Sequence, residues 1–438
     1  TLAVGQRMEA LKKLEQGILN CEQELYAALK KDLGKSRAES YMCEVGLTLS
    51  ELRFVKKHVQ KWSREKRVPT PLAQFHARSF TVQEPYGVVL VMSPWNYPVL
   101  LTLEPLIGAL AAGNCCVLKP SAYSPATSAV MKKMIADVFP EEYVTVIEGG
   151  REENQNLLSQ KFDYIFFTGG VQVGKMVMEK AAANLTPVTL ELGGKSPCII
   201  DKSANLKLTA KRLAFGKYLN CGQTCVAPDY VLVHEAVKEE FLKLLKSEIR
   251  AMYGEDPLKN PDYGKMINRK HFDRVLGLMK EEKLILGGEN DTESLRIAPA
   301  VMDQVTEDDA VMQEEIFGPL LPVLTVGSME EAIAFVNRRP KPLALYLFTE
   351  NRETEKNVLE YTSFGGGCIN DTIIHLATSQ MGFGGVGNSG MGSYHGKKSF
   401  ETFSHEKSIV KKYTWMDLPM RYQPYTGWKE KLVRMFVK

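Results

Sequence analysis

Apolar side chains recur at helical spacing over the first part of the chain. Leu11, Leu14 and Ile18 lie three or four positions apart, and mostly polar residues separate them. This spacing is typical of an amphipathic helix, and Gly34 supplies a common stop signal after the last apolar position. The pattern predicts a helix from about residue 8 to residue 33 that covers a larger core.

A different pattern follows a polar, proline-containing break at residues 68–71, because short apolar runs then alternate with helical segments. The runs predict strands at residues 87–92, 115–118, 144–147 and 164–168, and helices are expected at 101–112, 128–138 and 173–183. Buried strands that alternate with helices are typical of parallel βαβ units in an open sheet.

The alternation restarts after Pro197, which indicates a second α/β domain in series with the first. Strands are expected at 198–200, 230–234 and 345–348, with one helix that ends at residue 218 and another that runs through residue 245. The glycine-rich segment 382–392 predicts a loop with little regular structure, because glycine is unfavourable inside helices and strands.

Composition and charge indicate which kinds of partner and which cellular location to expect for this chain. A formal net charge of +3 over 438 residues favours neither nucleic acid nor a membrane surface. Eight cysteines without a pairing rhythm, and no secretory pattern at the start, indicate reduced thiols and a cytoplasmic location. The apolar stretch 99–112 is too short to span a bilayer. The basic, partly apolar residues 428–438 predict a solvated tail, with contact to a surface or a neighbour as the alternative.

Cys225 is the first candidate for chemistry, because it ends a polar, glycine-containing turn after a helical pattern. A thiol is a strong nucleophile near neutral pH once it is ionised, although most such cysteines are small buried apolar side chains. Cys221 and Cys225 also match half of a zinc site. No second pair of Cys or His has ligand spacing, so we expect no metal.

Two other segments supply an acid–base group and an amide. Glu191 ends a short apolar run and precedes a Leu-Gly-Gly turn, which places it at the carboxyl end of a strand, where ligands bind in open α/β sheets. Asn96 lies between Pro94 and Pro98, which fix the backbone so that the amide can be aimed at an oxyanion. A rigid turn with a capping Asn is the alternative.

Two further segments carry features of nucleotide binding. Lys119 and Ser121 follow a predicted strand, where a lysine can meet ribose hydroxyls or phosphate. The turn 169–174 joins a strand to a helix, and its glycines let backbone N–H groups approach a pyrophosphate. This turn nearly matches a P-loop, but Met176 stands where Mg²⁺ coordination needs Ser or Thr. A second near-match has Thr189 in place of its first glycine, so a phosphoryl-transfer enzyme is disfavoured.

Taken together and in this order, six segments resemble the aldehyde dehydrogenase superfamily from about residue 85 to residue 408. The segments are 94–98, 119–121, 167–174, 191–195, 222–225 and 314–319. Residues 384–408 and 417–422 resemble the class 3 branch, which acts on fatty and aromatic aldehydes. The resemblance implies oxidation of medium- or long-chain aliphatic or aromatic aldehydes to carboxylic acids, with NAD or NADP as cofactor.

The resemblance also implies catalytic roles. Cys225 would form a thiohemiacetal and then a thioester, and Asn96 with the Cys225 N–H would hold the oxyanion. Glu191 would activate the water that hydrolyses the thioester and would help to deprotonate the thiol. The substrate-lining candidates are Tyr97, Leu100, Tyr218 and His395.

For the cofactor, the resemblance implies that Glu315 holds the nicotinamide ribose with Phe317 beside it. Lys119 would hold the adenosine ribose, and the turn 169–174 would hold the pyrophosphate. The other cofactor-binding candidates are Trp95, Ser121, Gly169, Gly170, Val173, Gly174 and Leu192. Gly170 replaces a Ser that is frequent in the family. Ala122 replaces an acid that would bind ribose hydroxyls and repel a 2′-phosphate, so we expect dual use of NAD and NADP.

The implied fold is α/β, with a Rossmann-like cofactor domain, an α/β catalytic domain and a small β extension for oligomerisation. The expected limits are 1–190, 191–400 and 401–438, and an oligomerisation strand near 74–84 interrupts the first domain. This strand would join strands near 407–413, and the class 3 likeness implies a homodimer.

Two alternatives for the function remain. An acylating relative would pass the thioester to coenzyme A, but Glu191 supplies a base for hydrolysis. A non-enzymatic structural or binding protein on this scaffold would lack Cys225, Glu191 or Asn96, and all three are present.

Overall fold

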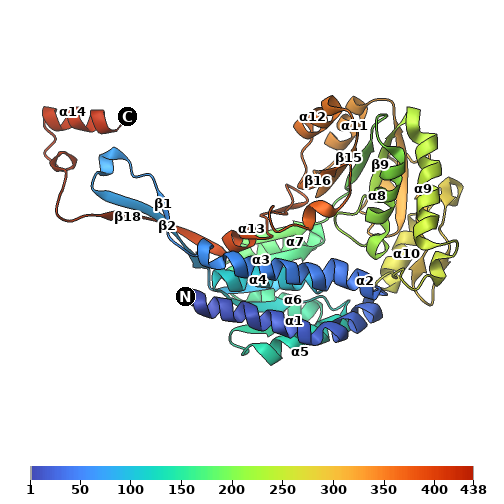
Figure 1. Ribbon diagram of the computed structural model, residues 1–438, viewed down its shortest axis with the longest axis horizontal. Coiled ribbons are helices and arrows are strands. Elements are labelled where there is room, and N and C mark those ends of the chain that lie inside the picture. The colour runs from blue at the N-terminus through green and yellow to red at the C-terminus, as the bar shows by residue number, and fades with distance from the viewer. Residues whose placement is uncertain (1, 438) are drawn as a thin grey trace.

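The computed structural model describes residues 2–437, so Thr1 and Lys438, the last residue of the expected tail, lie outside the described residues. Figure 1 shows two α/β lobes side by side and a long arm that projects from the first lobe and carries the C-terminal helix. Each lobe is built round one mainly parallel sheet, as the alternation of apolar runs and helical patterns predicts.

The first lobe contains a six-stranded sheet with the order β17-β7-β6-β3-β4-β5. Its strands are β3 (Val88–Met92), β4 (Cys115–Lys119), β5 (Val144–Val146), β6 (Tyr164–Gly169), β7 (Val188–Leu192) and β17 (Gly390–Met391). Strands β3 to β7 pair in parallel, and β17 runs antiparallel to β7. The carboxyl ends of the parallel strands therefore share one edge, where the polar candidates of the sequence are expected.

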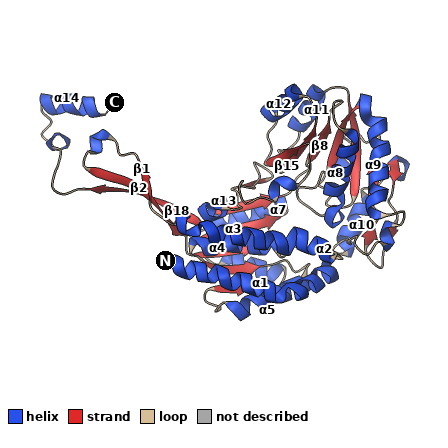
Figure 2. Cartoon of the chain, viewed as in Figure 1, coloured by secondary structure: helices blue, strands red, loops and turns tan. Residues whose placement is uncertain are grey.

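The helices of the first lobe cover this sheet, either directly or in a second layer that packs on other helices (Figure 2). They are α1 (Val4–Leu33), α2 (Arg37–Ser40), α3 (Gly46–Trp62), α4 (Leu100–Ala112), α5 (Pro125–Val138), α6 (Arg151–Ser159), α7 (Val171–Ala182) and α13 (Lys397–Thr402), and a π-helical turn at Tyr41–Val45 leads into α3. The predicted helix α1 buries Leu11, Leu14 and Ile18 and ends at Gly34, whose φ of 72° suits glycine. Helix α4 is buried on every side because it is almost wholly apolar.

The second lobe contains a seven-stranded sheet with the order β10-β13-β14-β9-β8-β15-β16. Its strands are β8 (Pro197–Ile200), β9 (Tyr230–His234), β10 (Leu284–Leu286), β13 (Ala300–Met302), β14 (Leu320–Val326), β15 (Ala344–Phe348) and β16 (Gly366–Ile369). Its helices are α8 (Leu206–Tyr218), α9 (Lys238–Tyr253), α10 (Arg269–Gly277), α11 (Met329–Asn337) and α12 (Arg352–Tyr361), and a small ribbon pairs β11 (Asn290–Asp291) with β12 (Arg296–Ile297). All neighbours pair in parallel except β10.

The arm is a three-stranded antiparallel sheet with the order β1-β2-β18. Strand β2 (Ala77–Pro85) pairs along its whole length with β18 (Ser404–Lys412), so the expected extension near 74–84 and 407–413 is confirmed. Strand β1 (Lys66–Val68) was not predicted, because its sequence is short and basic and lies beside prolines.

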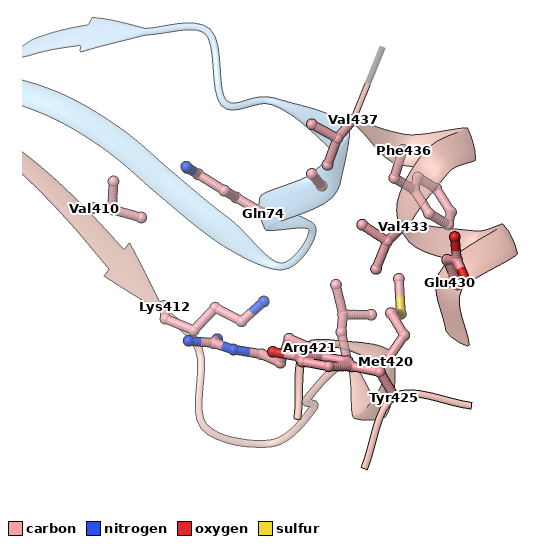
Figure 3. Close-up of a pocket in the computed structure, with 12 residues that line it drawn as sticks. Gln74, Val410, Lys412, Met420, Arg421, Tyr425, Glu430, Val433, Phe436 and Val437 are labelled. Carbon is pink, nitrogen blue, oxygen red and sulfur yellow. The ribbon is translucent and has the colours of Figure 1, made fainter. Parts of the chain in front are cut away.

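The tip of the arm carries α14 (Gly427–Phe436), so a helix occupies the region that was expected to be a solvated tail. Val433, Phe436 and Val437 face Gln74 and Val410 across a groove of about 850 Å³ (Figure 3). Trp428 is more than half exposed beside them. Across the part of the chain that the structure describes, no helix combines the length and the apolar character needed to cross a membrane.

The glycine-rich segment 382–392 is mostly a loop, as predicted, and contains one short strand near its end. Gly390 and Met391 form β17 and pair with Glu191 and Leu190 of β7, so the chain returns to the first lobe. Gly390 has a φ of 142°, and a Cβ at this position would overlap the carbonyl oxygen of Leu190, which explains why glycine permits the pairing. Helix α13 also packs on α4, so this part of the chain contacts the first lobe, and the domain limit at residue 400 stays a prediction.

Candidate active site

Two cavities meet at Cys225. The larger has a volume of about 590 Å³ and extends from the end of β6 and the start of α7 to Cys225. The smaller has a volume of about 230 Å³ and a mostly apolar lining. Cys225, Leu101, Phe383 and Tyr394 border both cavities, so ligands bound in the two cavities can meet at the thiol.

The loop that carries Cys225 has a strained backbone. After α8 ends, Asn220 and Cys221 adopt φ angles of 52° and 54°. The left-handed region costs roughly 1–2 kcal/mol for a residue with a side chain, so neighbouring groups must hold it. Asn220 donates its backbone N–H to Glu39 Oε1 at 3.0 Å and its side-chain amide to the Asn96 carbonyl at 2.8 Å. These bonds fix the path of the chain into Cys225.

The surroundings of Cys225 and Glu191 oppose ionisation. Burial and, after it, the charges of Glu315 and Glu191 raise the pKa of the Cys225 thiol to about 12. Burial also raises the pKa of Glu191, which lies 2% exposed on β7, well above its usual value. Among the described residues, neither oxygen of Glu191 has a hydrogen-bond partner. The site thus holds a thiol and a carboxylic acid whose ionisation depends on what enters the cavities.

Asn96 follows β3 and reaches the Cys225 loop. Its Nδ2 donates to the Gln223 carbonyl at 3.0 Å, which joins the two lobes at this point. A carboxamide nitrogen carries two hydrogens, so one remains for a ligand in the larger cavity, which Asn96 also lines. The next residue, Tyr97, places its hydroxyl 2.7 Å from Thr224 Oγ1. The structure therefore brings all three predicted catalytic side chains to one place.

Most predicted cofactor residues line the larger cavity. They are Trp95, Gly169, Gly170, Val173, Leu192, Glu315 and Phe317. Helix α7 begins after Gly170, and no atom lies within 4 Å of the place that a Cβ there would take, so an anionic group can approach the helix N-terminus. A side chain at Gly193 would overlap Glu315, whose pKa burial and Asp229 raise to about 8. This lining fits a dinucleotide.

Three predicted cofactor residues do not line this cavity. Lys119 Nζ donates to the carbonyls of Pro120 and Gly149 at 2.8 and 2.7 Å. Ser121 Oγ accepts from the Tyr123 N–H at 3.2 Å. Both Lys119 and Ser121 lie at the end of β4, which is the strand next to β3 in the sheet. Gly174 lies buried inside α7, where a Cβ would be 2.5 Å from Leu192. Gly174 therefore permits close packing of α7 on β7, and its contact with pyrophosphate stays a prediction.

Sequence reasoning missed His271 and Arg274, which lie one helical turn apart on α10 and line the larger cavity. The ring centroids of His271 and Trp95 are 5.1 Å apart, and burial lowers the pKa of His271 to about 4, so this imidazole is neutral. Arg274 donates to the Glu315 carbonyl at 3.3 Å. Their spacing on one helix face was the only signal in the sequence.

Tyr97, Leu100 and His395 line the smaller cavity, but Tyr218 does not, and contact of these residues with a substrate stays a prediction. Tyr218 is 1% exposed, and its hydroxyl donates to the Ala300 carbonyl at 3.0 Å. Phe215 and Leu219 line the cavity instead, although Phe215 precedes Tyr218 on the helix by less than one turn. On the same wall, His395 Nε2 lies 3.1 Å from Glu104 Oε2.

These features define a class of protein. A thiol, a carboxyl group and an aimed amide lie where a cleft for a dinucleotide meets an apolar cavity, which is the equipment of a nicotinamide-dependent oxidoreductase that acts on carbonyl compounds. A comparison with known protein families agrees, because residues 1–409 match the aldehyde dehydrogenase family. The chain belongs to the aldehyde dehydrogenase family.

Individual relatives sharpen this assignment. The 4,4'-diaponeurosporen-aldehyde dehydrogenase of Staphylococcus aureus (strain NCTC 8325 / PS 47) is 48% identical over 440 residues, which is 100% of this chain and 96% of that protein. Aldehyde dehydrogenase family 3 member B1 of Mus musculus is 45% identical over 96% of this chain and 90% of its own. A structure of the substrate-bound state of Staphylococcus aureus AldH matches with a TM-score of 0.98 and 48% identity, covering 100% of this chain and 95% of that one.

The chain is therefore an NAD(P)-dependent aldehyde dehydrogenase that is similar to family 3 members over nearly its full length. The family uses NAD or NADP. The predicted fold class, with two mainly parallel sheets and a separate antiparallel sheet, is confirmed. The predicted activity, aldehyde oxidation, is confirmed as well.

Proposed function

We propose that this chain oxidises aldehydes through a covalent intermediate on Cys225. The thiolate adds to the aldehyde carbon, and the resulting thiohemiacetal oxygen accepts hydrogen bonds from the Asn96 amide and the Cys225 N–H. A nicotinamide cofactor held in the larger cavity by residues such as Glu315 and Phe317 would supply the hydride acceptor. The observation that most supports this assignment is that Cys225 borders both cavities, so the carbonyl carbon and the hydride acceptor can meet there.

Glu191 is the proposed base for the second half of the reaction. It removes a proton from a water molecule, and the water oxygen attacks the thioester carbon. The carbon–sulfur bond breaks, the carboxylic acid is released, and the Cys225 thiol is regenerated. The raised pKa of Glu191 suits this task, because a weakly acidic carboxyl group is a stronger base once it has lost its proton. The absence of protein partners for its oxygens, within the described residues, leaves both oxygens available to a water.

The proposed substrates are medium- or long-chain aliphatic and aromatic aldehydes. The smaller cavity is lined by apolar side chains that include Phe215, Leu219, Ile373 and Phe383. An apolar tail gains roughly 25 cal/mol for each Å² that it removes from water in such a cavity. The relative from Staphylococcus aureus is named for 4,4'-diaponeurosporen-aldehyde, which supports a large apolar substrate here.

For the cofactor, we propose dual use of NAD and NADP. Ala122 is exposed next to Ser121, near the end of β4, and brings no carboxylate that would repel a 2′-phosphate. Lys119 adds a positive charge to the same region. Ser121 and Lys119 remain predicted contacts for the adenosine end of the cofactor.

The proposed assembly is a homodimer in the cytoplasm. Strand β18 leaves one edge of the arm unpaired among the described residues, and Ile409 and Val410 on this strand are exposed. An open strand edge with apolar side chains is suited to pairing with a second copy. All eight cysteines are free, which supports a reducing compartment.

A spectroscopic assay of reduced nicotinamide tests the proposed role of Cys225. Purified protein receives an aromatic or a medium-chain aldehyde with NAD or NADP, and Cys225→Ala is expected to lose at least about 10³-fold in rate, as loss of a nucleophile does elsewhere. Cys115→Ala is the matched control, because Cys115 lies on β4 away from both cavities. Oxidation by Cys225→Ala at the rate of the control would refute a covalent route through this thiol.

A further inference from the structure

The two donors of the proposed oxyanion site come from different lobes. Asn96 follows β3 of the first sheet, and the Cys225 N–H precedes β9 of the second. A shift of about 1 Å between such groups can cost as much as 10²-fold in rate. Something must therefore fix the two loops relative to each other, and the structure contains a buried ion pair at this point.

Lys35 and Glu44 form this ion pair, and both side chains are 0% exposed. Lys35 follows the end of α1, and Glu44 lies in the π-helical turn before α3. Lys35 Nζ donates to Glu44 Oε1 at 2.6 Å and to the carbonyl of Asn96 at 2.8 Å. The same ammonium group lies 4.0 Å from the centroid of the Tyr97 ring. The lysine thus contacts the backbone of the proposed oxyanion donor directly.

Glu44 holds the other end of the same segment. Its Oε2 accepts from the backbone N–H groups of Val99 and Leu100 at 2.8 and 3.1 Å, at the start of α4. A carboxylate at this position satisfies donors that a helix start leaves open. Lys35 and Glu44 therefore clamp residues 96–100 at both ends, with their own charges compensated by each other.

The clamp also reaches the loop of Cys225. The Asn96 carbonyl that accepts from Lys35 accepts in addition from Asn220 Nδ2 at 2.8 Å. Asn220 Nδ2 lies 3.2 Å from the Gln223 carbonyl, which is the acceptor for Asn96 Nδ2 as well. One carbonyl is thus shared between the ion pair and the strained turn that leads to Cys225.

We propose that Lys35 and Glu44 are positioning residues that fix the Asn96 amide against the Cys225 loop; this inference rests on the proposed function of those two residues. The pair does not touch the reacting atoms. It acts through the Asn96 carbonyl and the first turn of α4. A buried ion pair is a poor source of stability compared with apolar packing, so a role in geometry accounts better for two charges in this place.

The central test is a double-mutant cycle with Lys35→Met, which keeps most of the side-chain volume and removes the donor. We expect Lys35→Met to lower kcat by about tenfold or more, with less than about a threefold change in the KM for aldehyde, because an oxyanion contact matters most in the transition state. In an Asn96→Ala background the same substitution should lower kcat by less than about threefold, since the side-chain amide that it positions is already absent. An equally large fall in kcat on Lys35→Met with and without Asn96→Ala would overturn the proposal.

Lys238→Met is the matched control. Lys238 Nζ lies 2.8 Å from Asp303 Oδ1 in a mostly buried pair on the second lobe, away from both cavities. This variant removes the same group from the same kind of pair, so a kcat close to that of the unmodified enzyme is expected. Equal losses in Lys35→Met and Lys238→Met would show a general effect on stability and would contradict positioning.

Glu44→Gln provides a second route if Lys35→Met does not fold, which circular dichroism would show. The Gln oxygen can still accept from Val99 or Leu100, but the ionic contact to Lys35 is lost, so a smaller fall in kcat with the same non-additivity towards Asn96→Ala is expected. Failure of the proposed function is distinguishable, because Asn96→Ala alone would then retain full activity. Activity that falls in Asn96→Ala and is unchanged in both clamp variants would overturn only the clamp.

Discussion

The two cavities that meet at Cys225 are built in different ways. The larger is formed by glycine turns, a helix N-terminus and polar side chains such as Glu315 and Arg274, whereas the smaller is a pocket of apolar side chains from both lobes. The first suits a charged dinucleotide, and the second suits an apolar tail. Between them, desolvation keeps Cys225 and Glu191 neutral, so the division between the cavities also sets the chemistry of the groups at the junction.

Among substitutions at the two cavities and their junction, Glu191→Gln is expected to have the largest effect on turnover. The substitution keeps the shape of the junction and removes the base, so steady-state turnover should fall by about 10²- to 10⁴-fold. Hydride transfer does not need the hydrolytic water, so a single burst of reduced cofactor, close to one per active site, should remain. Stopped-flow absorbance measures both phases. Loss of the burst together with turnover would assign Glu191 to the first half of the reaction instead.

The next largest effect is expected on the free energy of unfolding and comes from Glu315, which lines the larger cavity. Glu315 has a pKa raised from 4.5 to about 8, so its contribution to stability is fully present below about pH 4.5 and is lost as the pH rises through about 8. Glu315→Gln copies the neutral acid, so it should match the unmodified protein at pH 5 and be more stable by about 2–4 kcal/mol at pH 9. Denaturant unfolding without cofactor measures this difference. Equal stabilities at pH 9 would contradict the buried, desolvated setting of this carboxyl group.

A smaller effect on kcat/KM should distinguish residues that line the aldehyde cavity from neighbours that do not. Phe215→Ala removes part of the apolar wall and should lower kcat/KM for a medium-chain aldehyde by about 10- to 100-fold, with the KM for NAD or NADP little changed. Tyr218→Phe, three residues further along the same helix, removes only the bond to Ala300 and should leave kcat/KM unaltered. If Tyr218→Phe had the larger effect on kcat/KM, the assigned lining of the aldehyde cavity would be wrong.

The smallest expected effect is on the choice of cofactor. Ala122→Glu adds a carboxylate at an exposed position near the proposed adenosine end, where solvent screens charge. The ratio of kcat/KM for NADP to that for NAD should fall by up to about tenfold, because a 2′-phosphate would meet a like charge. Steady-state rates with both cofactors at one ionic strength give this ratio. An unmodified enzyme that uses NAD alone would refute dual use.

The contrast between the cavities also explains how far the sequence can predict the site. Strand ends and glycine turns leave recognisable patterns, so the sequence by itself indicates Glu191, Asn96 and the turn at Gly169 and Gly170. An apolar side chain that lines a cavity has the same pattern as one that lies in the core. The pattern therefore does not distinguish Tyr218 from Phe215, which lies three residues earlier on the same helix and borders the cavity.

Contacts between segments that are distant in the sequence are the other feature that the sequence alone does not predict. The alternation of strands and helices predicts both parallel sheets, because each unit is local in sequence. Strand β17 consists of Gly390 and Met391, and it forms only because β7 lies next to it in space. Lys35 and Glu44 likewise carry no motif, since their burial depends on the segment around Asn96, which is distant in the chain.

The most direct test of the account is the intact mass of Glu191→Gln after one turnover with a medium-chain aldehyde and cofactor. A covalent route predicts an added mass equal to the acyl group, which proteolysis should place on Cys225 and which should be absent from a Cys225→Ala, Glu191→Gln double variant. Unmodified protein at the time when reduced cofactor has formed, or an acyl group on another cysteine, would contradict the claim that the two cavities meet at a catalytic thiol.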